Sequence, residues 1–129
     1  ICNFLKFLKF VKFLKFLLVA QTYENGSEDF NHVFDVAVRM FPADPTANLN
    51  AAAIELQQGS MQRAAQFLEK ADTELGATLN NKGVLKLLQG DVDAAESLFK
   101  QAKAKGVVEA DANLEEVAKK RKDIEFFGN

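Results

Sequence analysis

One histidine in the chain has the spacing of an acid–base pair. His32 lies three residues after Asp29 and three before Asp35. Residues three apart share a helix face, so a carboxylate could orient the imidazole there. Acyl transfer would also need a nucleophile, and the serines are expected at a cap, in a turn and in a helix body: Ser27, Ser60 and Ser97. We interpret His32 as a solvent-facing histidine and predict no catalytic residue and no enzyme.

A second group of acidic residues has part of the spacing of a calcium loop. Asp91, Asp93 and Glu96 lie close together, but the glycine and the distal glutamate of such a loop are missing. One histidine and one cysteine in the whole chain are too few for a structural zinc site. Gly59 and Gly90 are single turn glycines, unlike a phosphate-binding loop. The sequence therefore predicts no metal site and no cofactor.

Small residues and glycines recur along the chain with an offset of 31 residues, as from position 50 to position 81. The first copy contains Asn50, Ala52, Gln58, Gly59, Ala64, Leu68 and Ala71, and the second contains Asn81, Gly83, Gln89, Gly90, Ala95, Phe99 and Ala102. A period in the thirties with a central glycine is typical of stacked helical hairpins, which bury their apolar faces against one another. This pattern predicts an all-α fold and favours binding over catalysis.

Capping and breaking residues set the expected helix boundaries. The expected helices span about 28–42, 47–58, 61–72, 78–88, 92–105 and 111–126. Pro42 should end the first helix, and Thr46 and Asp91 are the predicted N-caps of later ones. The last helix is amphipathic, and we assign its apolar side to Leu114, Val117, Ala118, Arg121 and Ile124. It should cap the repeats.

The second copy resembles the tetratricopeptide repeat. The residues that match are Asn81, Gly83, the Gln89-Gly90-Asp91 turn, Ala95, Phe99 and Ala102. The resemblance implies antiparallel hairpins stacked as a short right-handed solenoid within a domain of residues 23–129. Its parts would be repeats at about 46–75 and 77–106, a half-repeat at 28–42 and a capping helix at 111–126. Asn48 and Leu79 depart from the family, which carries large aromatic residues early in the first helices.

The family's layout implies a ligand groove along the first helix of each repeat. Its lining positions correspond to Leu49, Asn50, Ala53, Leu56, Gln57, Asn80, Asn81, Val84, Leu87 and Leu88. Asn50 and Asn81 share one repeat position, and amides can bind a peptide backbone as donor and as acceptor; alternatively, they cap loops or bridge helices. Some family members hold a peptide carboxylate with Lys and Arg, which these positions lack. The implied partner is an extended peptide or a protein helix.

The N-terminal segment, residues 1–22, has low complexity, and residues 4–16 repeat an apolar triplet with lysine. A period of three fits neither a helix face nor a strand face. The alternatives are a membrane-surface helix, a helix packed on the repeats, and a sequence foreign to the native protein. The lysines disfavour a signal peptide and a membrane span. Apolar residues within 4–18 could also be covered in a homodimer.

The charge is unevenly distributed. Residues 1–19 hold four lysines and no acidic residue, and the remainder holds 12 basic and 18 acidic residues, which disfavours nucleic acid as a partner. Residues 38–52 resemble the helical-repeat tail of large envelope proteins from Bacteroides-type bacteria, which implies an envelope or periplasmic location rather than a cytoplasmic one. The predicted function is a non-catalytic interaction or scaffold module of such a protein. The alternative is a membrane-surface protein anchored by residues 4–18.

Overall fold

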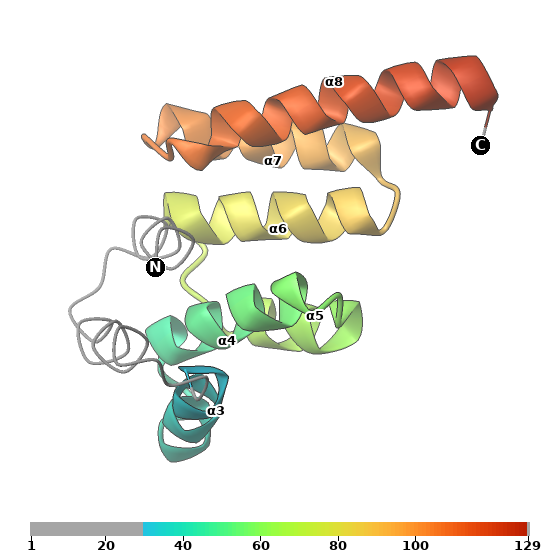
Figure 1. Ribbon diagram of the computed structural model, residues 1–129. Helices are drawn as coiled ribbons and strands as arrows, with labels where there is room; N and C mark the ends of the chain where they lie inside the picture. The colour runs from blue at the N-terminus through green and yellow to red at the C-terminus, as the bar shows by residue number, and fades with distance from the viewer. Residues whose placement is uncertain (1–29, 129) are drawn as a thin grey trace. The chain divides into compact units, whose positions relative to one another are not determined.

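The computed structural model describes residues 30–128, with side chains from Phe34 onwards. This range contains six helices and no strand: α3 (Phe30–Met40), α4 (Pro45–Gln57), α5 (Met61–Glu69), α6 (Gly76–Leu88), α7 (Val92–Ala104) and α8 (Glu109–Phe127) (Figure 1). The all-α prediction is confirmed for the described residues. The chain divides into two compact units between Asp72 and Thr73. None of these six helices is both long and apolar enough to cross a membrane.

In the first unit, two prolines mark the step from α3 to α4: Pro42 lies in the connector, and Pro45 is the first residue of α4. α3 ends at Met40, before Pro42, as predicted. The predicted cap of the next helix, Thr46, was wrong, because Asp44 is the N-cap and its carboxylate accepts a 3.0 Å hydrogen bond from the Thr46 backbone N–H. Pro45 explains the difference. Its fixed φ suits the first helical position, where its missing N–H costs nothing, so the cap is Asp44, two residues before Thr46.

The first hairpin consists of α4 and α5. Gly59 adopts a φ of 76° in the turn, and the Ser60 N–H donates to the Glu55 carbonyl over 2.8 Å. These features form a left-handed helix C-terminus, which satisfies the last carbonyls of α4. α5 ends at Glu69, earlier than the predicted Asp72. The Lys70 and Ala71 N–H groups bond to carbonyls three residues back and tighten the last turn.

The second unit repeats this plan and adds a long helix. Gly90 has a φ of 87°, and the Asp91 N–H donates to the Lys86 carbonyl over 2.9 Å. Asp91 is the N-cap of α7, as predicted, because its carboxylate accepts a 3.1 Å hydrogen bond from the Ala94 N–H. α8 runs beside α7 (Figure 1). The core between them consists of the buried side chains Val92, Ala95, Phe99 and Val117.

The apolar side of α8 differs from the prediction at two positions. Val117 is buried, and Leu114 and Ile124 are half-buried against the core, as expected. Ala118 is exposed, and Arg121 makes ion pairs with α7 in place of apolar contacts. α8 packs mainly against a single helix, so its buried stripe is narrow, and Ala118 lies about 100° around the axis from Val117.

Candidate binding site

The ten predicted groove residues differ in exposure. Those that are buried are Leu49, Asn50, Ala53, Asn80 and Asn81. Those that are half-buried are Leu56, Val84 and Leu87, and Gln57 and Leu88 are exposed. The asparagines were expected to offer amides to a ligand, yet Asn50 is only 3% exposed and Asn81 only 2%. In this conformation, the accessible part of the predicted groove lies at the C-terminal ends of α4 and α6.

The buried amide of Asn80 joins two helices. Its Oδ1 accepts a 2.9 Å hydrogen bond from Nδ2 of Asn113, so it links α6 to α8. Helix bridging was the alternative role predicted for Asn50 and Asn81. The structure shows this role at Asn80, the residue before Asn81. Oδ1 of Asn50 and Nδ2 of Asn81 are buried without a hydrogen-bond partner. An unpaired buried polar atom costs about 1–3 kcal/mol, so burial of these two amides lowers the stability of the fold.

Two of the predicted residues line a hollow between α6 and α8. Leu87 and Leu88 form the α6 side of this hollow, which has a volume of about 350 Å³. Its α8 side consists of Glu116, Lys119, Lys120 and Asp123. We call it the α6–α8 hollow. The last helix was predicted only as a cap over the repeats, and its charged residues were assigned to no site. These charged residues are three and four apart and so share one helix face, and this spacing was the feature of the sequence that could have indicated the site.

The α6–α8 hollow combines an apolar wall with a charged wall. Leu88 is 48% exposed, so it offers apolar surface to a ligand side chain. Lys119 and Lys120 supply two ammonium groups, which the predicted groove positions lacked, and Glu116 and Asp123 supply two carboxylates. A peptide could place an apolar side chain against the leucines and pair its polar groups with the charged wall. Nothing in this set provides a nucleophile with an adjacent base.

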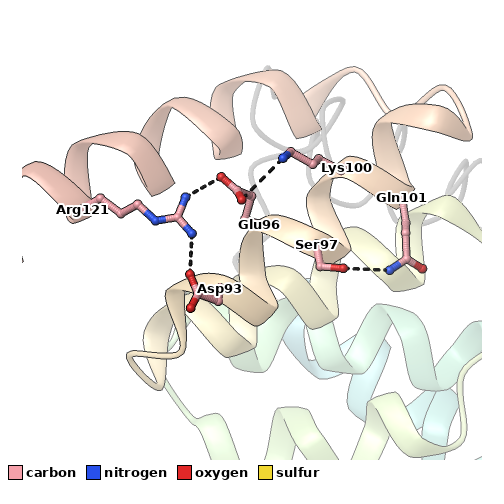
Figure 2. A network of polar contacts seen from close by, with 6 residues as sticks. All are labelled: Asp93, Glu96, Ser97, Lys100, Gln101 and Arg121. Atoms are coloured by element: carbon pink, nitrogen blue, oxygen red, sulfur yellow. Dashed lines mark hydrogen bonds and ion pairs between the residues drawn. The ribbon is translucent and has the colours of Figure 1, made fainter.

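Acidic residues of α7 form a polar network with α8 (Figure 2). Nη1 of Arg121 donates to Oε2 of Glu96 over 2.5 Å, and Nη2 donates to Oδ1 of Asp93 over 2.6 Å. Lys100 Nζ lies 3.5 Å from Oε1 of Glu96. The hydrogen bond from Arg121 is the main cause that lowers the pKa of Glu96 below its ordinary value. These carboxylates attach α8 to α7.

The residues considered first for chemistry have other contacts or lie outside the described range. Oγ of Ser97 accepts a hydrogen bond from Nε2 of Gln101 over 3.3 Å on the surface of α7 (Figure 2). The side chain of His32 and all of Asp29 lie outside the described residues, as does the predicted membrane contact at residues 4–18. Among residues 30–128, no three His, Cys, Asp or Glu side chains are grouped so that they could hold a metal ion.

Comparison of the chain with protein-family models, with curated proteins and with solved structures finds no match. The function is therefore inferred from the chain's own residues.

Proposed function

We propose that the chain is a non-catalytic protein–protein interaction module of the tetratricopeptide type, and that a peptide segment of its partner binds in the α6–α8 hollow. The observation that carries this proposal is the meeting of Leu87 and Leu88 with Lys119 and Lys120 around one hollow of about 350 Å³. A volume of this size accommodates one large side chain together with its backbone.

Equivalence of the two hairpins supports the repeat assignment. The turns at Gly59 and Gly90 are 31 residues apart and have nearly equal φ angles of 76° and 87°. In the second hairpin, Gly83 lies against the ring of Phe99. Ala52 and Leu68 occupy the same repeat positions in the first hairpin, and all four residues are buried. Hairpins of this kind stack on their neighbours, and a short right-handed solenoid is the arrangement we propose.

In that arrangement, α6 is the first helix of its repeat, and α8 takes the first-helix position of the next repeat. The surface between first helices is the inner face of such a solenoid, so the α6–α8 hollow lies where a repeat array holds its ligand. The same proposal makes the chain a scaffold domain within a larger bacterial envelope protein, on the strength of the resemblance of residues 38–52. An extended peptide with one apolar anchor side chain is the ligand that fits this hollow.

The test is selection of peptides from a random displayed library against the full chain, followed by affinity measurement with variants. Leu88→Ser should raise the Kd of the selected peptides at least about tenfold, because truncating an anchor contact at the centre of an interface has effects of this size. Met61→Ser is the matched control, since Met61 is 39% exposed and does not line the hollow. Peptides that bind both variants equally well, or a library that yields no binder, would contradict the proposal.

A further inference from the structure

The outer face of α8 carries a line of exposed side chains. α8 turns its inner face to α7, where Val117 is buried and Arg121 makes ion pairs. On the opposite face, positions spaced alternately by four and three residues are all exposed: Val108, Ala112, Glu115, Lys119, Lys122 and Phe126. Because a helix completes one turn in 3.6 residues, this spacing keeps the six side chains in one line. We call this line the α8 stripe.

Both ends of the α8 stripe are apolar. Val108 is 75% exposed, and Phe126 is 85% exposed. Val108 is the N-cap of α8 and has the helical angles φ −65° and ψ −38°, so it continues the line of the helix by one residue. A surface that covers the stripe would remove both side chains from water, and this burial favours association.

The charge of α8 is divided between its two halves. Residues 109–116 contain four acidic residues and no basic one, and residues 117–122 contain four basic residues and no acidic one. Within the part of the chain that the structure describes, Glu115 and Lys119 make no ion pair. Two such helices complement each other when they run antiparallel, because the acidic half of one then lies beside the basic half of the other.

We propose that the α8 stripe is the interface of an antiparallel homodimer, in which α8 packs against α8 of a second copy. A two-fold axis at the middle of the stripe brings Glu115 of each copy to Lys119 of the other. The same register brings Val108 to Phe126 of the second copy, so the apolar ends cover each other. Each contact occurs twice by symmetry.

The stripe fits a second copy because it complements itself. Reversing its direction exchanges one apolar end for the other and exchanges Glu115 for Lys119. The remaining two positions are Ala112 and Lys122, which meet in the same register, and the methylene stem of a lysine can cover an alanine while its ammonium group stays in water. This proposal rests on α8 alone and does not depend on peptide binding in the α6–α8 hollow.

Sedimentation equilibrium of the full chain at low ionic strength tests this proposal, and we expect a reversible equilibrium between monomer and dimer. Glu115→Lys and Lys119→Glu each place like charges opposite one another. Each should raise the Kd of the dimer at least about tenfold, because like charges that face each other across an interface are strongly unfavourable. Glu125→Lys is the matched control, since Glu125 is exposed on α8 outside the stripe, and it should change the Kd less than about threefold.

Mixing the two charge variants makes the outcome decisive. A dimer of one Glu115→Lys chain and one Lys119→Glu chain has a lysine opposite a glutamate at both central contacts. The equal mixture should therefore dimerise about as tightly as the unaltered chain, although each variant alone does not. The proposal is overturned if the unaltered chain stays monomeric, if its dimer tolerates Glu115→Lys, if the mixture stays monomeric, or if Glu125→Lys has the same effect. A dimer formed through residues 4–18 would give the second of these results.

Discussion

Gly83 of α6 lies directly against the ring of Phe99 of α7. A Cβ atom at position 83 would come within 2.5 Å of Phe99 Cε1 and 2.7 Å of Cδ1, closer than real Cβ contacts. Phe99 is 0% exposed, so its ring has no free space to enter. We expect Gly83→Ala to destabilise the fold by about 1–3 kcal/mol through overpacking, offset in part by the roughly 1 kcal/mol of helix propensity that alanine gains. Urea unfolding followed by circular dichroism measures this.

The first hairpin offers the compensating change. Ala52 and Leu68 occupy the positions of Gly83 and Phe99, with the same offset of 31 residues, and both are buried. Combining Gly83→Ala with Phe99→Leu therefore installs the two residue types that the first hairpin carries at these positions. The double variant should be more stable than the sum of its single changes predicts, with a coupling of about 0.5 kcal/mol or more. If the changes in unfolding free energy of the two single variants simply add up in the double variant, the Gly83–Phe99 contact is not the cause of the destabilisation.

A second prediction concerns the caps of the two return helices. The carboxylate of Asp91 accepts a hydrogen bond from the Ala94 N–H, but Ser60, at the same repeat position, makes no side-chain capping bond. Asp91→Ala should lower the free energy of unfolding by about 1 kcal/mol, and Ser60→Ala should change it by less than about 0.5 kcal/mol. Parallel denaturant titrations of the two variants measure the difference. Equal losses would contradict the assignment.

The third prediction is a pH dependence that comes from Glu96. The hydrogen bond from Arg121 lowers the pKa of Glu96 in the folded chain. A lowered folded-state pKa contributes stability above the unfolded-state pKa, and this contribution is lost as the pH falls through the folded-state pKa. Arg121→Gln should therefore lose stability at neutral pH and match the unaltered protein in acid, and carboxyl NMR titration should show the pKa of Glu96 closer to its ordinary range.

The control for this pH dependence is the next residue on α8. Lys122 is exposed, and Lys122→Gln removes the same amount of charge without a contact to Glu96. The Arg121–Glu96 hydrogen bond is not the cause if Arg121→Gln is less stable than the unaltered protein by the same amount at every pH. It is also ruled out if the pKa of Glu96 shifts equally in Arg121→Gln and Lys122→Gln.

Asn48 provides the fourth prediction. Its Nδ2 donates hydrogen bonds of 2.9 Å to the carbonyls of Pro42 and Asp44, so a fully buried amide fastens the connector between α3 and α4. Asn48→Ala removes the side-chain hydrogen bond to the Pro42 carbonyl and one of two hydrogen bonds to the Asp44 carbonyl, which keeps the bond from the backbone N–H of residue 48. It should destabilise the fold by about 1–3 kcal/mol. Thr46→Ala is the control, since only the backbone of Thr46 serves the cap, and it should cost less than about 0.5 kcal/mol. Thermal unfolding of both variants gives the comparison.

Local chemistry made much of the fold predictable. Gly59 and Gly90 adopt the positive φ that a helix C-terminus needs, and Asp91 caps the helix after it. Helix ends were less accurate, because the last turn of α5 depends on bonds between residues three apart rather than on a breaking residue. The cap at Asp44 escaped the prediction because Thr46 is also a good capping residue, and the position of Pro45 decides between them.

The candidate site was predictable only in part. Leu87 and Leu88 came from the repeat register, but Glu116, Lys119, Lys120 and Asp123 face the hollow only because α8 packs beside α6. Likewise, the pattern placed Arg121 on an apolar stripe, and its partners Asp93 and Glu96 are more than twenty residues away in sequence. A contact between distant segments leaves no periodic trace in either one, so the sequence could not indicate it.

The sequence alone determined that this protein is built from helices, where its hairpins turn and which small residues recur, because glycine φ angles, capping bonds and helical periodicity act over a few residues. Only the tertiary structure decided that the Asn50 and Asn81 amides are buried, that Ala118 is exposed and that α6 and α8 share a hollow. Burial depends on which helix covers each face, and packing between distant segments sets that cover.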